Sequence, residues 1–247
     1  MSNTMQIIAA AMQADADTLR VVSQNIANAE TTAYRRQVPV SHLQFDQALG
    51  VVQSRVAALS VEPPAPTGLQ VAFDMRPASL KSTGEPLNLA LDGRGFFVLQ
   101  SSDGMFLTRR GDLRVGADGT LLGASGAPIL GDRGPIQIGT ESPTIAADGS
   151  VSVNGELIDR LRVVDVSDPS LLSSIGDGVY RVDASNVVEG TQPASVRQGF
   201  LESSNVAPVG ELMQLMETVR RFEAEQKFVR AYDGMLDKAI SELGKVG

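Results

Sequence analysis

The chain has 247 residues, of which 43% are hydrophobic, so it is long enough and apolar enough to bury a core in one large or two smaller domains. Its 21 basic and 29 acidic residues give a formal net charge of −8, and the basic residues gather only in pairs such as Arg109-Arg110. A net negative surface repels a phosphate backbone, so nucleic acid is excluded as an expected partner.

Residues 5–26 form the first predicted element, a helix without an internal glycine or proline. Apolar residues recur at alternating spacings of three and four, with Asp15 as the one polar exception, which is typical of a helix that packs on other helices as a coiled coil. These apolar positions are Met5, Ile8, Met12, Leu19, Val22 and Ile26.

The stretch "NIANAETTAYRR", residues 25–36, interrupts the helical pattern. Asn28 to Thr32 carry side chains that can bond backbone groups freed at a helix end, so the helical segment is expected to finish there, within residues 1–36. Tyr34 and the basic pair Arg35-Arg36 then begin the connection outward, either as contacts to a neighbouring subunit or as a solvated basic pair.

Residues 37–81 are predicted to be an extended linker. The stretch from 61 to 87 holds five prolines and two glycines, a composition that favours an extended chain with little packing of its own. Two alternatives stay open for residues 37–81, a crossing between inner and outer layers of an assembly or a simple tether.

Residues 82–200 are predicted to be an all-β domain. Short β-branched or aromatic runs such as "GFFVLQ" and "LRVVDV" alternate with turn dipeptides, among them Asp118-Gly119, Asn154-Gly155 and Asp177-Gly178. Regular turn signals between short strands indicate an antiparallel sandwich or a partly open barrel.

Residues 201–247 are predicted to hold a second long helix. Pro208 is expected in its first turn and Gly244 at its stop. We call the row of residues at alternating spacings of three and four the seam of a helix. The seam of this helix contains eight apolar residues, namely Leu212, Leu215, Val219, Phe222, Val229, Leu236, Ile240 and Leu243.

The overall prediction is an α+β fold in which the N- and C-terminal helices pair as a coiled coil. An isolated amphipathic helix is marginal in water, so the other terminal helix is the natural partner, although both helices lying on the β domain is an alternative. Apolar residues outside the seams, such as Ile7, Met213, Met216 and Phe228, need further neighbours, which favours contacts between subunits.

Three stretches resemble the bacterial flagellar rod and hook family. They are "NIANAETTAYRR", "STGEPLNLALDGRGFFVLQ" at 82–100 and "GFLESSNVAPVGELMQLMETVRRFEAEQKF" at 199–228, and they occur in the order of the family's signatures. Length and the C-terminal sequence look most like the proximal rod subunit of the F type, with the distal rod or hook subunit as the alternative. Ala33 departs from the family, which has glycine before the aromatic residue, and alanine is strained there if the backbone needs a positive φ.

The resemblance implies a structural axial subunit that stacks helically into the hollow drive shaft of the flagellum. Its partners are then copies of itself, other rod subunits and the flagellar export apparatus, and its location is the rod that spans the periplasm. The N-terminus lacks a basic start and a continuous apolar run, and no run approaches ~18 apolar residues, so we expect export without a cleaved signal peptide and no membrane insertion. The expected subunit-packing residues are Met5, Ile8, Met12, Leu19, Val22, Ile26, Tyr34, Leu212, Leu215, Val219, Phe222, Val229, Leu236 and Ile240.

Catalytic chemistry finds little support, so we expect no enzyme activity, no cofactor and no metal. The chain has no cysteine, and its single histidine, His42, lies in a polar stretch that favours a solvated side chain. The Asp-Gly dipeptides lack the acidic spacing of a calcium loop. A glycosidase needs only two carboxylates, but the chain has no tryptophan and 4% aromatic residues, so the alternative from another class is a carbohydrate-binding or adhesin-like β module.

Overall fold

The computed structural model describes the chain apart from residues 1, 41–69, 102–103, 169–170, 190–193 and 244–247. The chain forms two compact units, each described by itself here. The helical unit contains Met1–Ile26, Gln37–Ala72 and Pro208–Gly247, and the β-rich unit contains Ala27–Arg36 and Phe73–Ala207. The central part of the predicted linker, together with His42, lies outside the described residues.

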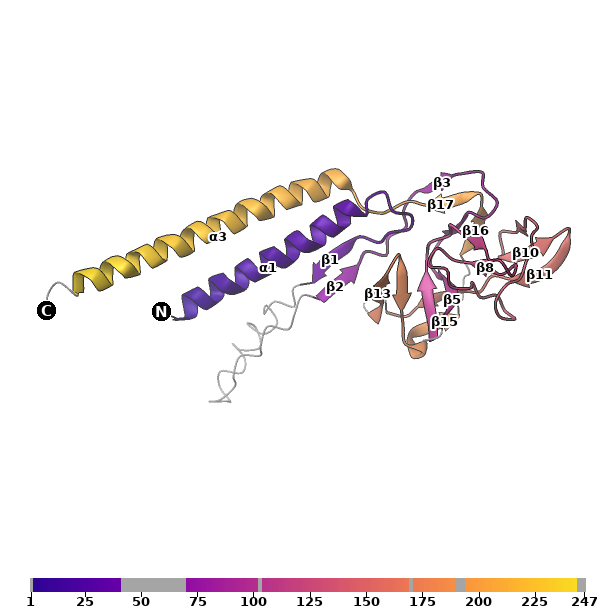
Figure 1. The fold of residues 1–247 in the computed structure, drawn as a ribbon, viewed down its shortest axis with the longest axis horizontal. Helices are drawn as coiled ribbons and strands as arrows, with labels where there is room; N and C mark the ends of the chain where they lie inside the picture. Colours follow the sequence, from indigo (N-terminus) through magenta and orange to yellow (C-terminus); the bar gives the residue numbers. More distant parts are fainter. Residues whose placement is uncertain (1, 41–69, 102–103, 169–170, 190–193, 244–247) are drawn as a thin grey trace. The chain divides into compact units, whose positions relative to one another are not determined.

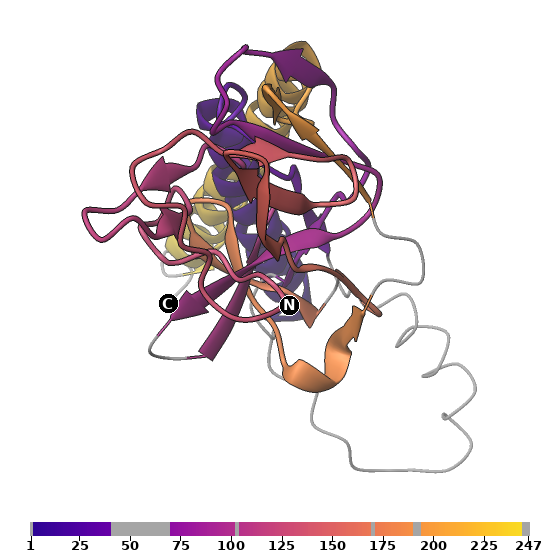
Figure 2. The same ribbon diagram turned by 90° about the vertical axis from the view of Figure 1, so that its right-hand side faces the viewer.

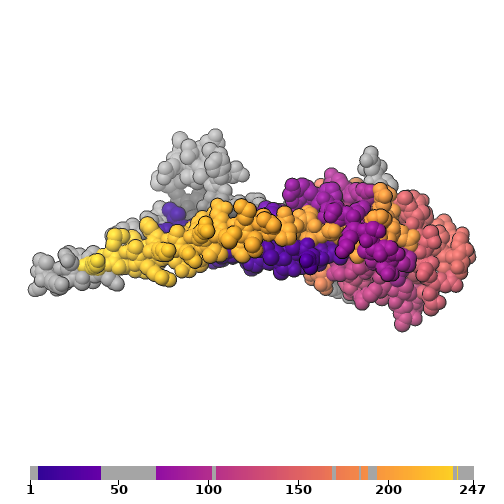
Figure 3. All heavy atoms as spheres, turned by 90° about the horizontal axis from the view of Figure 1, so that it is seen from above, coloured from indigo at the N-terminus to yellow at the C-terminus, as the bar shows by residue number. Residues whose placement is uncertain are grey.

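In its described residues, the helical unit has two long helices and a two-stranded sheet. Helix α1 spans Ser2–Ala27, helix α3 spans Pro208–Leu243, and strand β1 (Gln37–Val40) pairs with β2 (Gln70–Phe73). Helix α3 begins at Pro208 as expected, where the missing proline N–H leaves no helical hydrogen bond unmade. The two helices run side by side in opposite directions (Figures 1 and 3).

The largest sheet of the β-rich unit has six strands, and every neighbouring pair is antiparallel. Its order is β13 (Ser173–Gly176), β14 (Val179–Arg181), β6 (Gly104–Thr108), β5 (Phe96–Ser101), β12 (Val163–Val166) and β15 (Val187–Glu189). Strand β5 alternates its side chains between two apolar clusters, with Phe97 and Leu99 in one and Phe96 and Val98 in the other. The sheet is therefore covered by apolar side chains on both faces along β5.

Four small antiparallel sheets complete the β-rich unit, and their strands run in several directions (Figure 2). One sheet has three strands, β9 (Thr144–Ile145), β10 (Ser150–Val153) and β11 (Glu156–Arg160). The two-stranded sheets pair β4 (Leu89–Asp92) with β16 (Ser195–Gln198), β3 (Leu80–Ser82) with β17 (Phe200–Glu202), and β7 (Arg114–Val115) with β8 (Leu121–Leu122). A short 3-10 helix, η2, covers Ala184–Asn186.

Two of the predicted turn dipeptides close hairpins. Asn154 and Gly155, between β10 and β11, have φ angles of 53° and 83°, and Asp177 and Gly178, between β13 and β14, have φ angles of 50° and 70°. Two successive positive φ angles match the twist of antiparallel strands, and Asn-Gly and Asp-Gly adopt them at low cost. The strand and turn predictions for these segments are confirmed.

The predicted fold class is wrong on two points. The β strands form several small sheets around a six-stranded one, and not a single sandwich or barrel. The helices do not form the predicted coiled coil, because seam residues Leu212 and Val219 are 50% and 38% exposed while the buried neighbours are polar, Glu211 and Thr218. The observed architecture is two long helices plus a β-rich body of several antiparallel sheets.

The prediction of the α3 seam is wrong for a simple geometric reason. The predicted seam combined two rows of residues on α3, each repeating every seven residues, and only one of these rows faces the contact. Leu215, Phe222 and Val229 lie on the partly buried side, whereas Leu212 and Val219 lie on the exposed side. The residues buried in place of the second row are Glu211 and Thr218, each one residue earlier, and one residue corresponds to about 100° around a helix, so Leu212 and Val219 are turned out of the contact.

Candidate assembly surfaces and the junction after α1

The packing residues predicted on α1 are all at least partly buried. Val22 is 1% exposed, and Met5, Ile8, Met12, Leu19 and Ile26 are of intermediate exposure. Val21, which the spacing did not select, is equally buried at 2% exposure. Ile7 is 63% exposed, in agreement with its predicted position outside the seam. Packing of these side chains against other subunits stays a prediction.

Helix α3 carries an exposed row of large apolar residues near its start. We call Val209, Leu212, Met213, Met216 and Val219 the α3 apolar stripe, and these side chains are between 38% and 75% exposed. Their spacing of three and four residues places them on one side of the helix. Contiguous exposed apolar residues of this kind mark interaction surfaces on soluble proteins.

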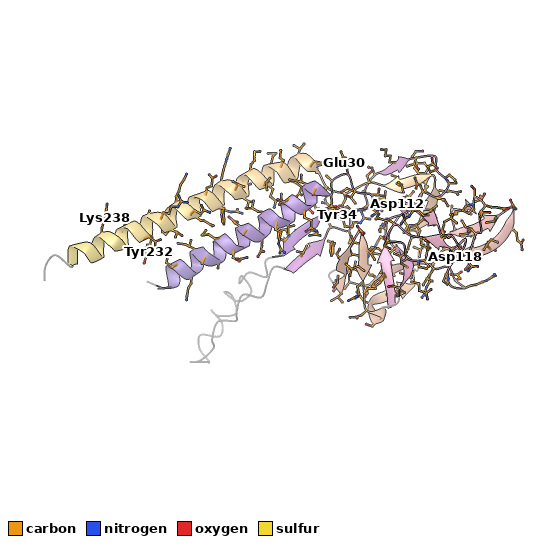
Figure 4. All side chains as sticks on the ribbon, viewed as in Figure 1. Glu30, Tyr34, Asp112, Asp118, Tyr232 and Lys238 are labelled. Atoms are coloured by element: carbon orange, nitrogen blue, oxygen red, sulfur yellow. The ribbon has the colours of Figure 1, made fainter. Side chains whose placement is uncertain are left out.

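The predicted packing residues in the second half of α3 are only partly described. Val229 is partly buried, and the side chains of Leu236 and Ile240 lie outside the described residues. Tyr232 and Lys238, labelled in Figure 4, lie on this C-terminal half of the helix. Phe228 and Met235 add exposed apolar surface there, at 51% and 61% exposure.

Polar pairs join α1 to α3 within the helical unit. Arg221 donates two hydrogen bonds from Nε and one from Nη2 to the carboxylate of Asp15, at 2.6–3.0 Å, and Asp15 is 6% exposed. Asn25 donates from its amide to Glu211 at 3.1 Å. The same Asn25 amide also donates to the Gln37 carbonyl at 2.8 Å and accepts from the Gln37 N–H at 2.9 Å, which attaches the start of β1 to the helix.

Glu225 lies close to the Asp15–Arg221 pair. Its Oε2 atom is buried and has no hydrogen-bond partner. Loss of hydration raises the pKa of the Glu225 carboxyl, and the neighbouring Asp15 charge raises it further. Arg221 faces carboxylates from Asp15, Glu217 and Glu225, and its hydrogen bonds to Asp15 raise the pKa of Arg221.

The junction after α1, residues 27–36, begins with a turn. The Asn28 carbonyl accepts from the Thr31 N–H at 3.1 Å, and the Thr31 hydroxyl donates to the Asn28 side chain at 3.2 Å. Ala33 follows with a φ of 54° and is 1% exposed. The position therefore does need a positive φ, and the alanine carries the strain that glycine avoids.

A buried ion-pair network fixes the junction to the β-rich unit. Glu202 at the end of β17 accepts from Arg35 Nη2 through Oε1 and from Arg109 Nε through Oε2, each at 2.8 Å. The side chains of Arg35, Glu202 and Arg109 are 1%, 1% and 4% exposed. Burial lowers the pKa of Arg109, and the Glu202 charge opposes that shift.

The remaining donors of the two arginines bind mainly backbone carbonyls. Arg109 donates to the carbonyls of Leu91, Gly93 and Gly95 at 2.8–3.1 Å. Arg35 donates from Nη1 to the Arg76 carbonyl at 3.0 Å, while its Nε is buried without a partner. The network therefore ties four separate parts of the β-rich unit to one carboxylate.

Backbone contacts reinforce the same junction. The Ala33 N–H donates to the Glu202 carbonyl at 2.8 Å, and the Arg36 N–H donates to the Asn205 side chain at 2.6 Å. The Asn205 amide donates in turn to the carbonyls of Asp74 and Arg76 at 2.7 and 3.1 Å. Residues 33–36 are thus held between two segments of the β-rich unit.

The structure changes the interpretation of the basic pair. Both sequence-based alternatives, a contact to a neighbouring subunit and a solvated pair, are wrong for Arg35, whose charge is neutralised inside its own chain. Tyr34, labelled in Figure 4, is 9% exposed. A contact of Tyr34 with another subunit stays a prediction.

The expected absence of a metal site can be compared with the described residues. Among them, no three His, Cys, Asp or Glu side chains come together in a way that could hold a metal ion. An open depression beside β3 and β17 is lined by residues such as Ser82, Thr144 and Gln198, and none of its lining side chains is titratable. None of the helices in the described part is long and apolar enough to cross a membrane.

Two family models match the chain. The model described as "Flagellar basal body rod FlgEFG protein C-terminal" matches residues 197–242, and "Flagellar hook protein FlgE/F/G D1 domain" matches residues 90–153. The first match covers β17 and nearly all of α3. The second covers the centre of the β-rich unit.

Several known flagellar rod proteins are similar to this chain over most of its length. The flagellar basal-body rod protein FlgF of Caulobacter vibrioides is 31% identical, over 92% of this chain and 92% of that protein, and FlgF of Salmonella typhimurium is 32% identical, over 90% and 92%. The rod protein FlgG of Buchnera aphidicola from Acyrthosiphon pisum is 30% identical over 91% and 93%. With this similarity along nearly its whole length, the chain belongs to the family of flagellar basal-body rod proteins, in agreement with the F type that its sequence resembles.

Proposed function

We propose that the chain serves as a structural subunit of the flagellar basal-body rod and packs onto neighbouring subunits through the α3 apolar stripe. The observation that supports this packing is the row of five exposed apolar side chains on a helix of 36 residues. Water-exposed apolar area of this extent is costly unless a partner covers it, and burial of each such side chain contributes about 1.5–3 kcal/mol. The family's role in the rod supplies the setting in which such a partner exists.

The partners we propose are copies of this chain and other rod subunits, and the place is the basal body. The relatives with rod names support this location. Delivery through the flagellar export apparatus without a cleaved signal belongs to the same proposal and rests on the family resemblance. A role without catalysis fits the packing surfaces and the structural family.

We further propose that different parts of the chain have different roles. Residues 1–36 and 201–247 carry the assembly helices, residues 82–200 the outer β domain, and residues 37–81 the connection. The ion-pair network around Glu202 supports a firm connection of residues 33–36 to the β domain, which suits a part that must transmit force.

A deletion experiment tests the role. Cells that lack this chain should not swim, and their isolated basal bodies should lack a complete rod and the hook. Expression of the intact chain from a plasmid should restore both. Normal swimming and complete basal bodies in the deletion strain would contradict a role as a required rod subunit.

A further inference from the structure

Two polar pairs connect α1 to α3, and both involve buried side chains. Asp15 meets Arg221 in the first pair, and Asn25 meets Glu211 in the second. The exposed fractions are 6% for Asp15, 0% for Asn25 and 2% for Glu211. Buried polar groups are costly without their partners, so these contacts constrain the helices far more than an exposed pair does.

The two pairs share one antiparallel register. Asp15 and Asn25 are ten residues apart on α1, and Glu211 and Arg221 are ten residues apart on α3. Ten residues correspond to about 15 Å of helix on each side. A single alignment of the helices therefore satisfies both pairs, and a slip of one turn breaks both at once.

The apolar residues of the helices define this alignment less sharply. Met12 and Leu19 on α1 are seven residues apart, and Leu215, Phe222 and Val229 on α3 repeat at the same interval of seven. A slip of seven residues places apolar side chains opposite one another again. Apolar contact is non-directional, whereas a single buried polar residue in such a row can specify register.

The carboxylates around Arg221 make its position important for the register of the two helices. Three carboxylates act on Arg221, those of Asp15, Glu217 and Glu225. If α1 slipped, Asp15 would lose three hydrogen bonds from Arg221 and keep its buried charge near the helix interface. Arg221 itself is 53% exposed, so the buried partner is Asp15, and loss of Arg221 leaves the Asp15 carboxylate buried without its hydrogen bonds, which is destabilising.

We propose that Asp15–Arg221 and Asn25–Glu211 are the register-specifying contacts of the helical unit, with Arg221 as its main positioning residue. They select one antiparallel alignment of α1 on α3 and thereby determine which side chains the paired helices present to other subunits. The consequence for assembly rests on the proposed function, whereas the register itself does not.

Cross-linking measures the register, because the chain has no native cysteine. Thr18 and Thr218 lie opposite each other in the observed alignment, since each is three residues from a member of the Asp15–Arg221 pair. Thr18→Cys with Thr218→Cys is the in-register pair, and Ala11→Cys with Thr218→Cys is the control pair shifted by seven residues, about 10 Å. A short bis-maleimide is applied to whole cells that produce the full chain, so assembled and unassembled copies are both sampled.

The in-register pair should link about tenfold more than the shifted pair, which corresponds to a coupling of about 1.4 kcal/mol. Arg221→Gln should remove most of this preference, and Arg221→Lys, which keeps the charge, should retain more of it. The sharpest variant moves the cation by seven residues, Arg221→Gln with Gln214→Arg. It should raise linkage of the shifted pair at the expense of the in-register pair.

Two results would overturn the register proposal, namely equal linkage of the two pairs in the native background, or a preference that Arg221→Gln and the moved cation both leave unchanged. A general loss of structure would lower both linkages together, whereas the proposal predicts that the ratio changes. Failure of the rod role would appear separately, as absence of the chain from isolated basal bodies whatever the cross-linking ratio.

Discussion

Replacement of Glu202 with Gln is expected to lower the free energy of unfolding of the β-rich unit by about 3–5 kcal/mol. Glu202 neutralises Arg35 and Arg109, and all three side chains are at most 4% exposed. The amide keeps the shape of the carboxylate but removes its charge, so two buried guanidinium groups lose their shared counter-ion. Urea denaturation of the purified full chain, followed by β-sheet circular dichroism, measures the loss.

Glu156→Gln is the matched control for this experiment. Glu156 lies in β11, is exposed, and undergoes the same chemical change. Its replacement should alter the free energy of unfolding by less than about 0.5 kcal/mol. If Glu202→Gln costs no more than this control, then the network around Glu202 does not hold the junction to the β-rich unit.

The second large effect concerns the α3 apolar stripe. Leu212→Asp combined with Met216→Asp should abolish incorporation of the chain into basal bodies and stop swimming. Each aspartate places a charge where the proposed contact buries an apolar side chain, and an unpaired charge is costly to remove from water. Both residues are 50% exposed, so the fold of the isolated chain should change little.

The design separates loss of contact from loss of helix. Both side chains are half exposed on a helix of 36 residues, and aspartate in place of an apolar residue lowers helix propensity by less than about 1 kcal/mol per position, so the helix itself should persist. The control exchanges the two side chains, Leu212→Met with Met216→Leu, which keeps apolar character and volume and should retain swimming. Normal swimming with the double aspartate variant would show that this stripe is not needed for assembly.

Local patterns predicted the elements of the structure well. The apolar repeat without glycine or proline predicted α1, Pro208 predicted the start of α3, and Asn154-Gly155 predicted a hairpin. Each of these features depends on residues within a few positions of one another. For that reason one sequence was enough to predict them.

Contacts over long sequence separations were missed. Glu202 and Arg35 lie 167 positions apart, and no local pattern connects a carboxylate at the end of one strand with an arginine after a helix. Asp15 did stand out, as the polar exception in an apolar row. Its partner Arg221 becomes apparent only when the antiparallel alignment of the two helices is known.

The α3 apolar stripe shows where the spacing of apolar residues led to a wrong prediction. The sequence combined Leu212 and Val219 with Leu215 and Phe222 in a single seam, although the two sets lie on different sides of the helix. A helix with two apolar sides satisfies the coiled-coil spacing in more than one phase. Met213 and Met216, which the sequence pattern placed outside the seam as needing further neighbours, were the better indication of the exposed apolar side of α3.

Electron microscopy of isolated basal bodies with a labelled chain tests the role in the rod most directly. An epitope inserted between Asn154 and Gly155, at the exposed turn of the β10–β11 hairpin, should be tolerated because loop tips accept insertions. In cells that swim with only this version, antibody-bound gold should decorate the rod segment of the basal body. Basal bodies that are complete and functional but carry no label at the rod would contradict the assignment.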